Sequence, residues 1–287
     1  MDISSNGYRY TWHEQWAKLP ESSASNGTTH GVQVLKDGRV VVFNQASPAV
    51  LTYSASGKLL NAFGEYEGAH GLIAREDGGE ARLYITDEFN SKVHVLDLEG
   101  NVIVDVAPPP AEAQANDLGR EKFVPTWMDR GPDGDLWVAD GYGTWKVYRY
   151  DSEGNYKSCI DGSEGAGRFN EPHGLAFSPR GELWITDRSN LRVTVYDADG
   201  NYLRHRDGLF HSPAAFAFHG DHAYVAEIAG GMKIVNHDLE LVASLGDNPA
   251  ITPNTEPGTW CPTENHRQPG WPNVDPTLLH AGHFHTP

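Results

Sequence analysis

Residues 170–203 read NEPHGLAFSPRGELWITDRSNLRVTVYDADGNYL, and this stretch decides the fold. It begins with an apolar strand, turns at Gly181, and continues in a second strand that ends at Asp187. A third, alternating strand leads to another turn at Gly200. Weaker copies of the pattern begin near His30, His70, Thr126 and Pro213. A repeat of about 40–50 residues with several strands in each copy is typical of a β-propeller, so we expect an all-β fold.

The copies predict one propeller domain over residues 1–287. Five blades are expected, at 28–63, 68–106, 123–160, 169–205 and 210–246. Residues 8–16 look like an outer strand of the closing blade, and 247–287 like a long loop that leads into a sixth. Because Phe284–Pro287 resembles the run-up to another copy, we expect six blades with the last one incomplete. A five-bladed ring with unrelated tails is the alternative.

The composition argues against nucleic acid and membranes as partners. The chain has 39 acidic against 22 basic residues and a net charge of −17, and such a surface repels nucleic acid. No apolar run approaches the roughly 18 residues that a membrane helix needs, so no membrane contact is expected. The start lacks a signal-peptide pattern, which predicts a cytoplasmic protein, although a mature secreted form would look the same. Cys159 and Cys261 form neither a metal motif nor a disulfide framework.

A polar residue follows the second strand of every copy. These residues are Asn44, Asp87, Asp140, Asp187 and Glu227. A side-chain oxygen at this place can accept backbone N–H groups and tie the next turn. We therefore expect a structural role for all five.

The residues at the start of each copy's first strand, the expected inner strand, are a second equivalent set. They are His30, His70, Thr126, His173 and Ala214. The inner strands of a propeller line a central channel, so equivalent residues are expected to point toward one axis. Three histidines with an open position describe a catalytic zinc site. The alternative is that each histidine caps its strand by bonding to the backbone.

The repeats resemble NHL repeats, and over residues 8–245 they are most similar to the peptidyl-α-hydroxyglycine α-amidating lyase family and its bacterial relatives. This resemblance implies a six-bladed propeller with a zinc ion on its axis. The family's metal ligands are histidines that open blades two, four and six. His70, in Ala-His-Gly-Leu, matches the second blade, and His173, in Pro-His-Gly-Leu, matches the fourth. The third ligand would follow Pro287.

Two further motifs carry the resemblance. Asp140-Gly141-Tyr142 matches the third blade of the family and implies that Tyr142 is the catalytic base. The run 187–190, Asp-Arg-Ser-Asn, matches the fourth blade and implies that Arg188 faces the substrate and takes part in catalysis. The alternatives are a packed loop tyrosine and an arginine in a salt bridge with a neighbouring acid.

The predicted substrate contacts are His30, Gln45, Thr126 and Arg188. Gln45 stands where the lyase family has an arginine that helps to hold the substrate carboxylate. Glutamine can donate hydrogen bonds but has no charge, so a different substrate is expected.

We therefore expect a metal-dependent, lyase-like enzyme that acts on a small hydroxylated molecule of the α-hydroxyglycine type. The predicted cofactor is zinc or another divalent transition metal. A structural calcium ion is the second cofactor that we consider. Alternatives are a sugar or keto-sugar epimerase, isomerase or lyase on the same site, and a non-catalytic NHL interaction scaffold. The predicted partner is a small molecule, and the predicted assembly is a monomer or small homo-oligomer.

Overall fold

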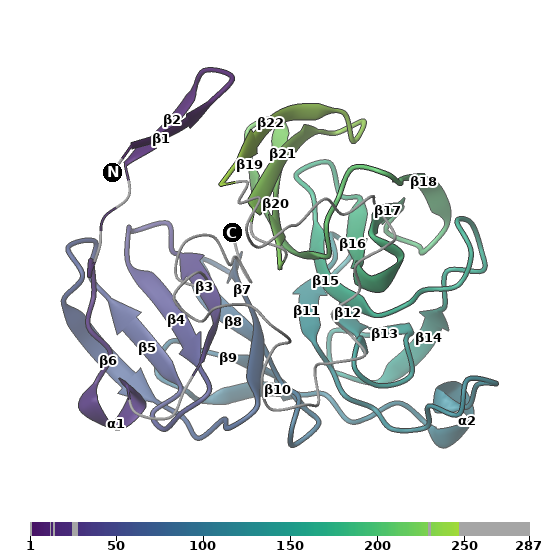
Figure 1. Cartoon of the computed structure of the whole chain (residues 1–287). Helices are drawn as coiled ribbons and strands as arrows, with labels where there is room; N and C mark the ends of the chain where they lie inside the picture. Colours follow the sequence, from purple (N-terminus) through teal and green to yellow (C-terminus); the bar gives the residue numbers. More distant parts are fainter. Residues whose placement is uncertain (1, 12, 14, 25–27, 229–230, 247–287) are drawn as a thin grey trace. The chain divides into compact units, whose positions relative to one another are not determined.

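The computed structural model describes residues 2–246 except 12, 14, 25–27 and 229–230. In this part of the chain, five four-stranded antiparallel sheets follow one another, and a two-stranded hairpin precedes them (Figure 1). The protein is all-β, and its sheets are blades of a β-propeller, as predicted. The predicted loop at 247–287, with Cys261, lies outside the described residues.

The chain forms two compact units, which are described separately. The N-terminal unit, residues 13–161, holds the first three blades. Blade 1 comprises β3 (Thr29–Val34), β4 (Val40–Asn44), β5 (Val50–Tyr53) and β6 (Leu59–Phe63). Blade 2 comprises β7 (Ala69–Asp77), β8 (Glu80–Asp87), β9 (Lys92–Leu96) and β10 (Val102–Asp105). Blade 3 comprises β11 (Trp127–Arg130), β12 (Leu136–Ala139), β13 (Val147–Tyr150) and β14 (Tyr156–Ile160). Two four-residue helices, α1 (Glu21–Ala24) and α2 (Ala111–Gln114), precede blades 1 and 3.

The C-terminal unit, residues 1–12 and 162–287, holds two more blades and the hairpin. Blade 4 comprises β15 (Pro172–Phe177), β16 (Leu183–Asp187), β17 (Arg192–Tyr196) and β18 (Tyr202–Arg206), with a 3₁₀ turn, η1 (Arg188–Asn190), after β16. Blade 5 comprises β19 (Pro213–His219), β20 (His222–Glu227), β21 (Gly231–Asn236) and β22 (Leu241–Leu245). The hairpin comprises β1 (Asp2–Ser5) and β2 (Tyr8–Thr11).

The middle strands of the blades form the core. Every residue of β5, β12, β16 and β17 is buried. These strands are rich in β-branched and aromatic residues, which suit a strand that is covered on both faces. Most residues of the outer strands β6, β10 and β18 are exposed or half-buried instead. The candidate site residues lie at the ends of the buried inner and middle strands, which therefore position them.

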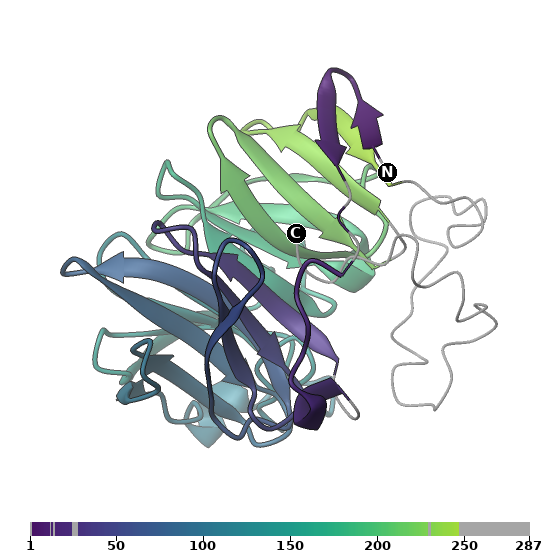
Figure 2. The ribbon, with the colours of Figure 1, turned by 90° about the vertical axis from the view of Figure 1, so that its left-hand side faces the viewer.

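The hairpin lies against blade 5 (Figure 2). The Asn6 side chain donates a hydrogen bond to the carbonyl of Val242 at 2.5 Å, and Tyr8 packs on the cluster formed by Ile234, Ala243 and Leu245. Residues 8–16 were predicted to form one outer strand of the closing blade. In the structure the strand of this segment, β2, covers residues 8–11 and pairs with β1.

The polar residues after the second strands tie turns, as predicted. One Asp140 oxygen accepts the N–H of Val124 at 2.6 Å, and the other accepts the N–H of Thr144 at 2.8 Å. Asp187 accepts the N–H of Asn170 at 2.8 Å. Similar bonds are made by Asp87 and Glu227 to backbone N–H groups and by Asn44 to a hydroxyl. The bonds from Thr144 and Asn90 tie the loop that follows the acid, and the bonds from Val124, Asn170 and His211 tie the segment that leads into the inner strand of the same blade.

In the described part of the chain, no helix has the length and apolar character needed to cross a membrane.

Candidate active site

His70 opens the inner strand of blade 2, and its side chain is completely buried. Its Nδ1 lies 2.7 Å from the carbonyl oxygen of Thr126, at the equivalent place in blade 3. Because a carbonyl only accepts hydrogen bonds, Nδ1 carries the proton and Nε2 carries the lone pair. The backbone of blade 3 thus sets the tautomer of His70.

Two other predicted site residues surround His70. The Tyr142 hydroxyl lies 3.2 Å from Nε2 and donates to it, with the two rings perpendicular and their centroids 5.2 Å apart. The half-buried His30 ring stacks on His70 with centroids 4.9 Å apart. The N-terminal unit therefore brings His30, His70, Thr126 and Tyr142 together.

The glycine after His70 permits this close approach of the two blades. A Cβ on Gly71 would lie 2.6 Å from the carbonyl oxygen of Thr126, well inside van der Waals contact. The Gly71 N–H donates to the Thr86 hydroxyl at 2.8 Å, and that hydroxyl donates to the same Thr126 carbonyl at 2.9 Å. The packing between blades 2 and 3 thus requires a glycine at position 71.

Asp140 and Arg120 hold the loop that carries Tyr142. Burial raises the pKa of Asp140 to about 6, and the hydrogen bonds from Thr144 and Val124 oppose this shift. Arg120 donates to the carbonyl of Gly143 at 3.3 Å and stacks 3.9 Å above the Trp145 ring. Arg120 was not among the predicted site residues, and its place in the insertion between blades 2 and 3 is the signal in the sequence that points to it.

The C-terminal unit repeats the arrangement of His70 at His173. His173 is completely buried, and its Nδ1 lies 2.9 Å from the carbonyl oxygen of Ala214 in blade 5. The Gly174 N–H donates to the Thr186 hydroxyl at 2.7 Å. A Cβ on Gly174 would overlap the carbonyl oxygen of Ala214. His173 therefore has the same tautomer as His70, with the lone pair on Nε2.

Arg188 is completely buried and forms an ion pair with Glu171, whose side chain is also buried. The salt bridge that the sequence analysis kept as an alternative for Arg188 is therefore present. Glu171 accepts a further hydrogen bond from the Ser189 hydroxyl. Glu171 was missed, although an acid two residues before His173 was a visible signal.

Gln45 contacts an acid that was also missed. Its Nε2 donates to Oε1 of Glu88 at 3.3 Å, and both side chains are half-buried. Glu88 directly follows Asp87, as Gln45 follows Asn44 and Arg188 follows Asp187. This shared place in the repeat is the signal that could have identified Glu88.

The geometry of His70 and His173 fits metal ligands. A ligating histidine commonly donates its other ring N–H to a carbonyl or carboxylate, which orients the lone pair toward the metal. Both imidazoles do this with Nδ1. Capping a strand and binding a metal are thus compatible, because they use different nitrogens. Among the described residues there is no cluster of three or more His, Cys, Asp or Glu side chains arranged for a metal.

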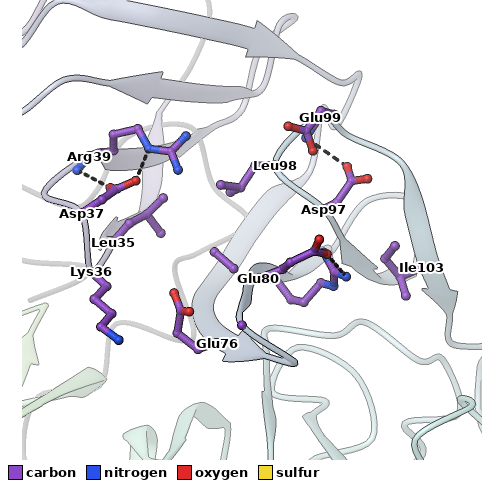
Figure 3. A pocket seen from close by; sticks show the side chains of 13 residues that line it. Leu35, Lys36, Asp37, Arg39, Glu76, Glu80, Asp97, Leu98, Glu99 and Ile103 are labelled. Carbon is purple, nitrogen blue, oxygen red and sulfur yellow. Dashed lines mark hydrogen bonds and ion pairs between the residues drawn. The ribbon is translucent and has the colours of Figure 1, made fainter.

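A pocket of about 670 Å³ lies at the ends of blades 1 and 2 that are opposite to His70 (Figure 3). It is lined by the first turns of both blades and by the second turn of blade 2. Its charged side chains include two ion pairs, Arg39 with Asp37 and Arg82 with Glu80. The strand directions place this pocket away from His70 and Tyr142, so we do not assign it to the candidate active site.

Sequence comparison identifies an NHL repeat at residues 169–196. NHL repeat-containing protein 3 of Homo sapiens is 25% identical over 225 residues, covering 73% of this chain and 64% of the relative. A probable peptidyl-alpha-hydroxyglycine alpha-amidating lyase of Caenorhabditis elegans is 25% identical over 207 residues, covering 69% of this chain and 55% of the relative. The chain thus spans less than two thirds of the length of these relatives.

Solved structures of enzymes share the fold. A streptogramin B lyase matches with a TM-score of 0.61 and 16% identity, covering 89% of this chain and 76% of the lyase. An inactive variant of virginiamycin B lyase from Staphylococcus aureus matches with a TM-score of 0.58 and 14% identity, covering 77% and 71%. A gluconolactonase from Xanthomonas campestris matches with a TM-score of 0.56 and 15% identity, covering 76% and 75%. At these identities the matches show the fold alone. The chain is a β-propeller protein with an NHL repeat, and its sequence resembles NHL repeat-containing protein 3 and an α-amidating lyase.

Proposed function

We propose that the protein is a metal-dependent, lyase-like enzyme that acts on a small hydroxylated substrate of the α-hydroxyglycine type. One observation carries the proposal. The Nε2 lone pair of His70 lies 3.2 Å from the Tyr142 hydroxyl, and the bond from Nδ1 to Thr126 fixes the tautomer. A metal donor and a candidate base therefore lie within one hydrogen-bond length in one unit. The sequence similarity to an α-amidating lyase supports this reaction class.

His70 and His173 would hold a divalent transition metal such as zinc through their Nε2 atoms. We propose that His70 and His173 bind the same metal ion for two reasons. They hold equivalent places in the second and fourth repeats, and each makes the same bond from Nδ1 to a backbone carbonyl. When bound, the metal would supply Lewis acidity and make a substrate hydroxyl easier to deprotonate. Because Nδ1 already bonds to a carbonyl, each imidazole ring would keep its orientation, and at His70 the metal would take the place of the Tyr142 hydroxyl on Nε2.

Tyr142, as its phenolate, would act as the general base on the substrate hydroxyl, and a bound metal and Arg188 would stabilise that phenolate. As Tyr142 removes the hydroxyl proton, the electrons of that O–H bond form a carbonyl and the neighbouring carbon–nitrogen bond breaks. The departing nitrogen then takes this proton from Tyr142, so the products are an amide and glyoxylate. Arg188 would donate a hydrogen bond to a substrate oxygen, while Glu171 balances its buried charge. His30 and Thr126 would line the space beside the reacting group.

The test is the release of glyoxylate from a peptide that ends in α-hydroxyglycine, with zinc supplied. The matched control is the same peptide ending in glycine, which lacks the hydroxyl. We expect glyoxylate and the peptide amide in equal amounts from the first peptide and neither from the second. If the zinc-loaded protein releases no glyoxylate, the lyase proposal is wrong, and sugar and keto-sugar substrates become the next to test.

A further inference from the structure

We infer that Glu171 is a positioning residue, which holds the guanidinium of Arg188 for the substrate and is not needed for the fold of its blade. This role deepens the proposed function and rests on it, because Arg188 is the residue proposed to donate a hydrogen bond to a substrate oxygen. The observations that carry it come from two equivalent places in the C-terminal unit, one in blade 4 and one in blade 5.

The backbone makes the same contacts at these two places. In blade 4 the N–H of Arg188 donates to the carbonyl of Glu171 at 3.1 Å, and in blade 5 the N–H of Ile228 donates to the carbonyl of Ser212 at 3.1 Å. Glu171 and Ser212 both lie in the left-handed region, with φ of +67° and +54°. The proline that follows each of them pairs with the acid at the end of the second strand. Glu171 and Ser212 are therefore equivalent, and so are Arg188 and Ile228.

The side chains at these equivalent places differ in charge, although all four are buried. In blade 4 Arg188 and Glu171 form an ion pair, whereas Ile228 and Ser212 in blade 5 are neutral. Burying two charges costs desolvation free energy, and a neutral pair of similar volume often serves a fold equally well. Because blade 5 makes the same backbone contacts without these charges, the contacts in blade 4 do not require the ion pair.

Glu171 is itself held in place by its neighbours. One carboxylate oxygen accepts a hydrogen bond from Arg188 Nη2, and the other accepts the Ser189 hydroxyl at 2.5 Å. The N–H of Ser189 donates to the carbonyl of Asn170 at 3.0 Å, which ties the same two segments together. A carboxylate bound at both oxygens is restricted in orientation, and it restricts the planar guanidinium that is paired with it. His173 follows two residues later, so one short segment carries both the proposed metal ligand and the residue that holds Arg188.

Glu171 can affect Arg188 in two ways, and these predict opposite changes in anion binding. If Glu171 only neutralised charge, its removal would strengthen the attraction of Arg188 for an anion. If Glu171 positions the guanidinium, its removal weakens binding, because a flexible side chain must then be immobilised when the ligand binds. The two hydrogen bonds that fix the Glu171 carboxylate favour the second effect.

The test is a double-mutant cycle on glycolate binding, measured by calorimetry in the presence of zinc. Glycolate carries the hydroxyl and the carboxylate of the proposed substrate, and its binding needs no turnover. The variants are Glu171→Gln, Arg188→Met and the double variant, which nearly conserve side-chain volume. We expect each single variant to bind glycolate at least about tenfold more weakly than wild type. Glu171→Gln should have less than about a twofold further effect once Arg188 is replaced.

Thermal unfolding separates this role from a purely structural one. Each single variant leaves one buried charge without its partner and should lower the midpoint of unfolding by about 5 °C or more. The double variant, which is neutral like the pair in blade 5, should recover most of this loss. Glu240→Gln is the matched control, because Glu240 is an exposed acid in the turn between β21 and β22. It should change neither the midpoint nor the affinity for glycolate.

Three binding results would overturn the positioning role of Glu171. They are wild-type protein that does not bind glycolate, tighter glycolate binding by Glu171→Gln, and an effect of Glu171→Gln that persists when Arg188 is replaced. A double variant no more stable than the single variants would show that the fold needs the ion pair, and would overturn it too. If wild-type protein releases no glyoxylate but the expected pattern of glycolate affinities holds, the lyase reaction is rejected and the positioning role stands.

Discussion

At the scale of single residues, the two nitrogens of an imidazole do different work. In His70 and His173, Nδ1 donates to a backbone carbonyl of the next blade and helps to hold the blades together. This bond leaves the lone pair on Nε2, where a metal would be bound. Under the proposal, a buried histidine that caps a strand in this way would also be oriented to bind a metal.

Replacing Tyr142 by phenylalanine tests the proposed base. The change removes only the hydroxyl that lies 3.2 Å from His70 Nε2. We expect kcat to fall by about 10²–10⁴, the usual contribution of a general base, while zinc content and thermal stability stay near those of wild type. Steady-state kinetics, metal analysis and thermal melts measure the three quantities.

Tyr150→Phe serves as the control for this substitution. Tyr150 is buried in blade 3, and its hydroxyl has no hydrogen-bond partner among the described residues. We expect its turnover to equal that of wild type. If Tyr142→Phe retains full turnover, Tyr142 is not the base.

Asp140 predicts a specific pH dependence of stability. Burial raises its pKa from 3.8 to about 6, so the folded state holds this proton more tightly than the unfolded state does. The contribution of Asp140 to stability is therefore complete below pH 4 and is lost as the pH rises through about 6. The free-energy difference between wild type and Asp140→Asn should shrink by up to about 3 kcal/mol from pH 4 to pH 7. Chemical denaturation at several pH values measures it, and a constant difference would contradict the assignment.

At the scale of strands and turns, the glycine after each histidine lets two inner strands approach. A Cβ on Gly71 would lie 2.6 Å from a carbonyl oxygen of blade 3, which is backbone and cannot rotate away. We expect Gly71→Ala to destabilise the protein by about 3 kcal/mol or more, as overpacking does at its upper end, and to displace His70. Denaturant unfolding and zinc affinity should both report the change.

Gly79→Ala separates crowding from backbone strain. Gly79 has φ +89°, but a Cβ there would meet no atom within 4 Å. It should cost only the strain of a left-handed residue, about 1–2 kcal/mol, with zinc affinity unchanged. If Gly71→Ala is no worse than Gly79→Ala, the close approach of the two strands does not require glycine.

Several side-chain contacts made by the loops could not be predicted from the sequence. Repeat alignment predicted that His70 opens an inner strand and that a polar residue follows each second strand, because a repeated strand pattern specifies which residues share a position. Tyr142 was predicted from the resemblance to the lyase family instead. Repeat alignment could not predict the stacking of Arg120 on Trp145, since that contact depends on the path of an insertion that no other repeat contains. It also missed Glu171 and Glu88, because their roles depend on a side-chain partner in another loop.

At the scale of the whole molecule, the fold was the most predictable property. Alternation of apolar strands with glycine turns, copied along the chain, predicted an all-β propeller, and the structure has five four-stranded sheets in the described residues. The repeats could not predict that β1 pairs with β2 and that the hairpin lies on blade 5, since the hairpin has no counterpart among them. The metal that would join the second and fourth repeats is still a proposal.

Zinc binding by the purified protein tests the central claim most directly, because it asks whether His70 and His173 are ligands. Metal content after dialysis, and zinc affinity by competition with a chelator, would be measured for wild type, His70→Ala, His173→Ala and His205→Ala. His205 is the control, since it is exposed on β18 and pairs with Asp207. We predict about one zinc per chain in wild type and His205→Ala, and at least about a tenfold loss of affinity in the other two variants. Wild-type protein without bound metal, or undiminished binding in His70→Ala and His173→Ala, would contradict the account.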